Sequence, residues 1–220
     1  IKLARYFICN MTEVKICGLS DTDMIDCALD AGADHIGFVH FKKSPRHLTF
    51  DKIAELSIHV GARAQTWIVL ASPSEHMLRE ACGVDMISGI QFHGELPQNA
   101  KRLCEAHSKA VMQAYSVETD LALKAASSAI AERLLFDAKP CSEDELPGGN
   151  GVAFSWPLMQ KFETDKPWLL AGGLTPDTVA LAIEQSGAPG VDVSSGVERA
   201  PGVKDARLIK AFIEAAKRAA

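Results

Sequence analysis

The sequence predicts an α/β protein in which eight parallel strands close into a single-domain (β/α)8 TIM barrel. Short apolar runs alternate with helical patterns eight times along the 220 residues, and no linker or shift in composition divides them. Such alternation indicates a parallel sheet covered by helices, and about 200 residues is near the lower size limit of an eight-unit barrel. A doubly wound open sheet of similar content is the alternative that periodicity alone leaves open.

The expected strands are apolar runs too short for helices and bounded by turn residues. In chain order they cover residues 14–17, 35–39, 65–70, 87–92, 110–114, 134–136, 168–171 and 191–193. The barrel domain is therefore expected over residues 14–220. Residues 1–13 form an N-terminal extension of unassigned function, without the charged, apolar and small-residue order of a secretory signal.

The helices between the strands follow from caps and apolar spacing. Ser20, with Asp23 three residues on, is the expected N-cap of the first helix, and Gly32 ends it. The segment Ser72-Pro73-Ser74-Glu75 has a cap residue, a first-turn proline and an acidic third position, which is typical of a helix start. Further helices are expected near residues 51–60, 97–107 and 118–131, from Ser155, from Thr175-Pro176, and over 208–216.

Composition argues against several classes of function. The net charge of −5 gives no basic surface for nucleic acid, and no apolar run approaches the roughly 18 residues that span a bilayer. The six cysteines are scattered without a C-x-x-C pair, which argues against a zinc site or a disulfide framework. Reduced thiols are typical of the cytoplasm. We therefore expect a cytoplasmic protein that binds no nucleic acid, membrane or metal.

Chemistry in such a barrel belongs at the C-terminal ends of the strands and in the loops after them. Small residues fill the loops after the last two strands, Gly172-Gly173 and Ser194-Ser195-Gly196. Glycine lets backbone amides approach a phosphate closely, and barrels often bind phosphate at this pair of loops. Either loop alone could be a tight turn, but together they predict a phosphate site.

Two residues at strand ends can exchange protons with a substrate. Cys17 ends the first run, and its thiolate can take a proton from carbon if its pKa is lowered from about 8.5. Asp137 follows three apolar residues, and a carboxyl beside apolar surface can act as an acid. The structural alternatives are a packed strand-end cysteine and, for Asp137, a helix cap or a partner of Lys139.

Three further polar residues lie near the same strand ends. Asp192 lies inside the eighth run, where an unpaired charge is costly, so it needs a polar partner. Arg46 lies in the cationic segment 42–47; such segments are usually solvated surface, but an arginine can hold a carboxylate through a bidentate pair. His93 is either a donor toward a ligand or a structural histidine. Residues 148–151 are either a mobile cover or a simple connection.

Together these motifs resemble the phosphoribosylanthranilate isomerase family. The resemblance runs in order from about Val14 to the C-terminus, and the ordered set is far more specific than any one piece. The matching segments are VKICG (14–18), GAD with GF (32–38), SPR (44–46), QFHG (91–94), LFD (135–137), GGNG (148–151), AGGL (171–174) and DVSSGVE (192–198).

The resemblance implies a cofactor-free and metal-free barrel of tryptophan biosynthesis, acting as a monomer or homodimer on a phosphorylated small molecule. Its reaction is the Amadori rearrangement of N-(5-phosphoribosyl)anthranilate to 1-(2-carboxyphenylamino)-1-deoxyribulose 5-phosphate. The resemblance implies that Asp137 is the general acid that opens the furanose ring and that Cys17 is the general base at the adjacent carbon. Arg46 would bind the anthranilate carboxylate. The resemblance also implies that His93 and Asp192 line the substrate pocket. The phosphate would be bound by the two loops that contain Gly172, Gly173, Ser195 and Gly196.

The chain departs from the family pattern in two places. Asn150 stands where the family usually has a hydroxyl residue, and Ser155 where an aspartate is common, so that loop and the following helix cap are expected to differ in detail. Two rival functions follow from the same motifs. The histidine-pathway isomerase is expected to use aspartates on the first and fifth strands, whereas the first strand here ends in Cys17. A non-catalytic phosphate-binding barrel would not need Cys17 or Asp137.

Overall fold

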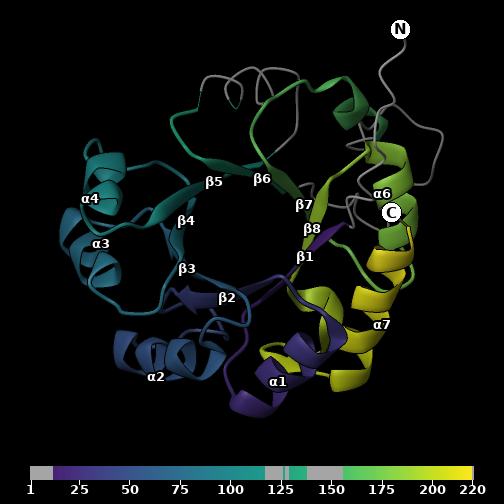
Figure 1. Cartoon of the computed structure of the whole chain (residues 1–220), viewed down its shortest axis with the longest axis horizontal. Helices are drawn as coiled ribbons and strands as arrows, with labels where there is room; N and C mark the ends of the chain where they lie inside the picture. The colour runs from purple at the N-terminus through teal and green to yellow at the C-terminus, as the bar shows by residue number, and fades with distance from the viewer. Residues whose placement is uncertain (1–11, 117–125, 127–128, 138–155, 220) are drawn as a thin grey trace, which may run out of the picture.

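The computed structural model describes residues 12–116, 126, 129–137 and 156–219, and its main sheet is a closed barrel of eight strands in sequence order. Figure 1 looks down the ring of strands, with the helices on its outer side. Each neighbouring pair of strands is parallel, and β8 pairs with β1 to close the ring. The predicted barrel is confirmed, and the open sheet is excluded because it would leave two edge strands.

The strands lie within two residues of their predicted limits. They are β1 (Glu13–Cys17), β2 (His35–His40), β3 (Gln65–Ala71), β4 (Gly89–His93), β5 (Ala110–Ser116), β6 (Arg133–Asp137), β7 (Trp168–Ala171) and β8 (Gly190–Val193). Strand β1 begins at Glu13, one residue before the expected start of the barrel domain. Residues 1–11 lie outside the described residues, so the extension remains without an assigned function.

Helices pack around the outside of the ring. They are α1 (Thr22–Ala31), α2 (Phe50–Val60), α3 (Glu75–Cys82), α4 (Ala100–Ala106), α6 (Val179–Ser186) and α7 (Ala206–Arg218). Two predicted caps are wrong, because Asp21 rather than Ser20 caps α1, and Ser74 rather than Ser72 caps α3. Each true cap accepts a hydrogen bond from the amide three residues on. Where cap-forming residues are adjacent, sequence alone does not select among them.

Two predicted helices begin later than expected. Helix α4 starts at Ala100 rather than at residue 97. Helix α6 starts at Val179, because Thr175 and Thr178 form a turn in which the Thr175 amide donates to Thr178 Oγ1 at 3.0 Å. Most of the predicted helix over 118–131, the loop 148–151 with Asn150, and Ser155 lie outside the described residues. Residues 129–131 are described and are not helical, and a 3-10 helix, η1, covers Trp156–Lys161.

A short hairpin after β8 is absent from the sequence-based prediction. A 3-10 turn, η2 (Ser195–Val197), leads into β9 (Glu198–Ala200), which pairs antiparallel with β10 (Val203–Lys204). Strands this short carry no period-two pattern long enough to recognise. The hairpin lies at the carboxyl end of β8, where barrels place their functional loops.

Apolar side chains form two layers, one between the strands and the helices and one inside the barrel. Successive side chains of β1 point to opposite faces of the sheet, so Val14 and Ile16 lie in the outer layer while Lys15 and Cys17 face the interior. The inner apolar cluster is Trp67, Met112, Ala114, Leu135, Leu169 and Ala171. Polar residues at the carboxyl ends of the strands are therefore supported by a filled barrel.

The described cysteines are all free thiols, and three of the four are buried. They are Cys17, Cys27, Cys82 and Cys104; Cys9 and Cys141 lie outside the described residues. Among the helices that the structure describes, none is long and apolar enough to cross a bilayer.

Candidate active site

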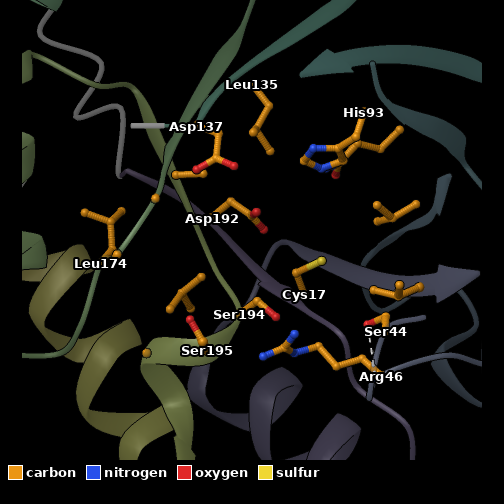
Figure 2. A pocket seen from close by; sticks show the side chains of 18 of the residues that line it. Cys17, Ser44, Arg46, His93, Leu135, Asp137, Leu174, Asp192, Ser194 and Ser195 are labelled. Carbon is orange, nitrogen blue, oxygen red and sulfur yellow. Dashed lines mark hydrogen bonds between the residues drawn. The ribbon is translucent and has the colours of Figure 1, made fainter. Parts of the chain in front are cut away.

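A cavity of about 450 Å³ opens at the carboxyl ends of the barrel strands, and Figure 2 shows its lining side chains. The cavity is lined by residues of β1, β2, β3, β4, β6, β7 and β8 and of the loops that follow some of these strands. All nine residues proposed from the sequence line it: Cys17, Arg46, His93, Asp137, Gly172, Gly173, Asp192, Ser195 and Gly196. Apolar residues such as Val39, Val69 and Leu135 fill the wall between them. The barrel thus brings every proposed site residue to one place.

A buried ion pair lies beneath this cavity. Asp192 was expected to need a polar partner, and Lys15 provides it, since Lys15 Nζ donates to Asp192 Oδ1 at 2.8 Å. The Lys15 side chain is fully buried. Burial lowers the pKa of Lys15, but the neighbouring Asp192 and Cys17 outweigh that effect and raise it. The ammonium group is therefore charged, and the expected pairing of Asp192 is confirmed.

The Cys17 thiol lies at the end of β1, two residues after Lys15 and on the same interior face. Burial raises the pKa of this thiol above its ordinary value; the cations of Lys15 and Lys204 act in the opposite direction without cancelling the rise. Gly37 of β2 leaves room for this arrangement, because a Cβ there would lie 2.9 Å from Cys17 Sγ and 3.0 Å from Lys15 Nζ. Cys17 is thus a buried thiol beside two cations that favour its ionised form.

The Arg46 guanidinium is held by a carboxylate of the protein itself. Arg46 Nε donates to Glu198 Oε1 and Arg46 Nη2 to Glu198 Oε2, both at 2.6 Å. Lys204 Nζ donates to the same Glu198 Oε1 at 2.9 Å. Burial raises the pKa of Glu198, but the hydrogen bonds from Arg46 and Lys204 outweigh it and lower that pKa to about 2. From the sequence, a carboxylate partner for Arg46 was expected only in the substrate, so the pairing with Glu198 is an additional feature of the site.

Asp137 and His93 occupy another part of the wall. Asp137 is the last residue of β6, and Figure 2 shows its carboxylate directed into the cavity, with Asp192 between it and Cys17 in this view. The Gln91 side-chain amide donates to His93 Nε2 at 2.9 Å, which fixes the ring. Burial lowers the pKa of His93, so the neutral imidazole is the favoured form. His93 is therefore suited to a hydrogen bond with an uncharged part of a ligand.

The two small-residue loops require their glycines. Gly172 and Gly173 have φ angles of 94° and 62°, in the left-handed region that glycine adopts without strain. Gly196 packs against the other loop so closely that a Cβ would lie 1.9 Å from the carbonyl oxygen of Leu174. At Gly196 the loop after β8 therefore lies directly against the backbone of the loop after β7. Glycine leaves its backbone amide uncovered by a side chain, which suits these loops to an anion.

A profile of N-(5'-phosphoribosyl)anthranilate (PRA) isomerases matches residues 14–215, which is nearly the whole barrel. This chain belongs to the phosphoribosylanthranilate isomerase family. A relative with that name from Rhodopseudomonas palustris (strain BisB5) is 44% identical over 207 residues, covering 93% of this chain and 95% of its own.

Solved structures of phosphoribosylanthranilate isomerases share the fold. The enzyme from Thermotoga maritima is 30% identical with a TM-score of 0.78, and the match covers 94% of this chain and 100% of the other. A phosphoribosylanthranilate isomerase in complex with reduced 1-(o-carboxyphenylamino)-1-deoxyribulose 5-phosphate is 28% identical with a TM-score of 0.75 and the same coverage. The similarity therefore extends over the full barrel and includes a ligand-bound isomerase.

Sequence reasoning about this isomerase missed three charged residues at the site. Lys15 could have been found, since it lies two residues before Cys17 and must share its face of the strand. Glu198 was part of a recognised motif but had no assigned partner, and Lys204 gave no signal in the sequence. In the part of the chain that the structure describes, no group of three or more His, Cys, Asp or Glu residues could hold a metal ion.

Proposed function

We propose that this isomerase converts N-(5-phosphoribosyl)anthranilate into 1-(2-carboxyphenylamino)-1-deoxyribulose 5-phosphate, a step of tryptophan biosynthesis. Membership of the isomerase family supports the reaction. The observation that carries the residue roles is that a thiol and a carboxyl, Cys17 and Asp137, line the same cavity from different strands. The volume of about 450 Å³ also suits a small phosphorylated ligand, since such sites usually measure about 300–1,000 Å³.

The two anionic groups of the substrate have separate receptors in this proposal. The phosphate binds at the loops of Gly172-Gly173 and Ser195-Gly196, where backbone amides replace its water shell. The anthranilate carboxylate binds Arg46, on the loop after β2. His93 and Asp192 line the sugar between these ends. Binding both ends fixes the reacting carbons between the acid and the base, which lowers the entropy cost of the reaction.

The chemistry needs an acid that protonates the ring oxygen and a base that deprotonates the adjacent carbon, and the overall oxidation state does not change. Asp137 protonates the furanose ring oxygen, the bond from that oxygen to the anomeric carbon breaks, and an iminium forms with the anthranilate nitrogen. The Cys17 thiolate then takes the proton from the adjacent carbon, which gives an enolamine. The enolamine becomes the ketone when the former anomeric carbon gains a proton and the 2-hydroxyl loses one. Exchange with water then removes the proton from Cys17 and restores the proton on Asp137. One group must start protonated and the other ionised. Burial raises the pKa of Cys17, so the base is the ionised fraction of this thiol, and that fraction grows as the pH rises.

A continuous assay tests these roles. Freshly made phosphoribosylanthranilate is added to the wild type and to Cys17→Ala and Asp137→Asn, and the fall in anthranilate-ring fluorescence is followed. We expect turnover by the wild type and losses of about 10²-fold or more in both variants. Cys27→Ala is the matched control, because this cysteine lies on α1 and does not line the cavity. A folded wild type without turnover would disprove the proposed reaction and leave only a binding barrel.

We also propose that the enzyme acts in the cytoplasm, as a monomer or homodimer, on small molecules alone. The net charge of −5 gives no general attraction to nucleic acid. Light scattering on the purified chain measures the oligomeric state directly, and a larger assembly would contradict this expectation. The absence of a shift with duplex DNA in the same measurement would support the small-molecule assignment.

A further inference from the structure

The carboxylate of Glu198 accepts hydrogen bonds from three residues in two parts of the chain, the loop after β2 and the β9–β10 hairpin. It accepts from Arg46 Nε and Nη2, from Lys204 Nζ, and at 3.1 Å from the backbone amide of Gly202. The Glu198 side chain is only 3% exposed. A carboxylate with this number of donors is fully satisfied and fixed in orientation, and it has little capacity left for a ligand. Glu198 is therefore suited to hold other groups rather than to touch the substrate.

The Arg46 guanidinium is the group that Glu198 holds in position. A guanidinium presents five N–H donors, arranged along two edges that can each receive a carboxylate with two parallel hydrogen bonds. Glu198 occupies the edge made by Nε and Nη2. No described residue hydrogen-bonds the edge made by Nη1 and the second hydrogen of Nη2, and Arg46 lines the cavity. Arg46 can therefore bind the carboxylate of Glu198 and that of a ligand at the same time.

The hairpin after β8 places Glu198 beneath this arginine. Gly202 lies between β9 and β10 and packs on the loop of Arg46 so closely that a Cβ there would be 2.7 Å from the Pro45 carbonyl oxygen. Lys204, which also binds Glu198, donates to the Ser194 carbonyl at 2.9 Å and to Ser194 Oγ at 3.3 Å. One carboxylate thus joins the loop after β2 to the loop after β8, which are the two proposed anion receptors.

We propose that Glu198 is a positioning residue for the isomerase reaction: it fixes one edge of Arg46 so that the other edge receives the aromatic carboxylate of the substrate. This inference rests on the proposed function, in which Arg46 binds that carboxylate. Arg46 and Lys204 share the Glu198 Oε1 atom at 2.6 and 2.9 Å. Without Glu198 these two cations repel each other at close range, and the guanidinium loses the alignment that bidentate binding requires.

A double-mutant cycle between Glu198 and Arg46 tests the inference. Glu198→Gln keeps the side-chain size, and we expect the KM for phosphoribosylanthranilate to rise about tenfold while kcat changes less than about threefold. In an Arg46→Ala background, which itself has a raised KM, the same Glu198→Gln change should have no further effect on KM. The Ki of inorganic phosphate as a competitive inhibitor should stay within about twofold, because Lys204 keeps both bonds to Ser194.

Glu13→Gln is the matched control. Glu13 also accepts from two basic side chains, Arg133 and His35, but it lies at the opposite end of β1 from Cys17. Its replacement should lower stability without changing KM. If Glu198→Gln fails to fold, Arg46→Lys serves instead, because one ammonium lacks the two edges that this arrangement uses. We expect Arg46→Lys to raise KM nearly as much as Arg46→Ala.

The results separate the inference from the proposed function on which it rests. A wild type without turnover contradicts both the proposed reaction and the positioning role of Glu198. Turnover with an equal KM effect of Glu198→Gln in both backgrounds, or a fall in KM, overturns the role of Glu198 alone. A parallel rise in the Ki of phosphate also overturns it, because Glu198 would then support the phosphate loop rather than Arg46. An Arg46→Lys variant with nearly wild-type KM likewise overturns it, without need of the glutamate variant.

Discussion

Replacing Lys15 with methionine is expected to destabilise the barrel strongly. Methionine has a similar length and no charge, so the change removes the ammonium group and leaves most of the apolar stem. The carboxylate of Asp192, now 8% exposed with its ammonium partner at 2.8 Å, would lose that partner. Water is excluded from Lys15 itself, which is fully buried, so solvent cannot replace the ion pair without rearrangement.

The expected magnitude follows from the burial of the pair. Removing one member of a buried ion pair usually costs about 3–5 kcal/mol, because an uncompensated charge remains. For a chain of this size, about 1 kcal/mol corresponds to a change in Tm of about 2–4 °C. Lys15→Met should therefore lower Tm by about 10 °C. The double variant Lys15→Met/Asp192→Leu removes both charges and should recover most of this loss.

Urea-induced unfolding, followed by circular dichroism at neutral pH, measures the free energy of unfolding of the three proteins. The double variant controls for packing, since it keeps the methionine and removes only the stranded carboxylate. A loss below about 1 kcal/mol in Lys15→Met would show that the buried pair is not charged in the folded protein. A double variant as unstable as the single one would attribute the loss to packing instead of charge.

Three further outcomes are expected. Because burial raises the pKa of Cys17 above its ordinary value and the base must be ionised, kcat/KM should keep rising between pH 7 and pH 9, and a flat profile would contradict the assignment. Gly196→Ala would bring a Cβ to 1.9 Å from a facing carbonyl oxygen, so the KM should rise about tenfold or more. Gly83→Ala is the control and should leave the KM unchanged, because the nearest atom to its Cβ would be 3.4 Å away. The hydrogen bond with His35 helps lower the pKa of Glu13 to about 2, so its stabilising effect is present above pH 4.5 and is lost as pH falls toward 2. Acid titration of the unfolding free energy should consequently be less steep between pH 5 and 2 for Glu13→Gln, and an unchanged slope would rule out this linkage.

Local patterns predicted the strands well because each strand is a short apolar run between turn residues. The first-strand pattern, for example, misses the true start of β1 at Glu13 by one residue. Helix starts were less well predicted, as Asp21 and Ser74 show. The direction in which the chain enters a helix decides which side chain can accept a hydrogen bond from the first free amides. The hairpin of β9 and β10 was not predicted, since its pairing depends on the loop of Arg46 against which it packs.

The order of residues along the chain predicted the barrel and nine of the residues that line its cavity, whereas the open sheet was excluded only by the folded structure. Strand ends follow from the order of apolar runs, and parallel strands in a closed ring place all their carboxyl ends on one side. The pairing of charges became known only from the folded chain. Lys15 meets Asp192 across 177 positions because barrel closure puts β1 beside β8, and Arg46 meets Glu198 across 152 positions because the β9–β10 hairpin packs under the loop after β2. An ion pair depends on distance and burial in space, and a linear pattern of residue types contains neither quantity.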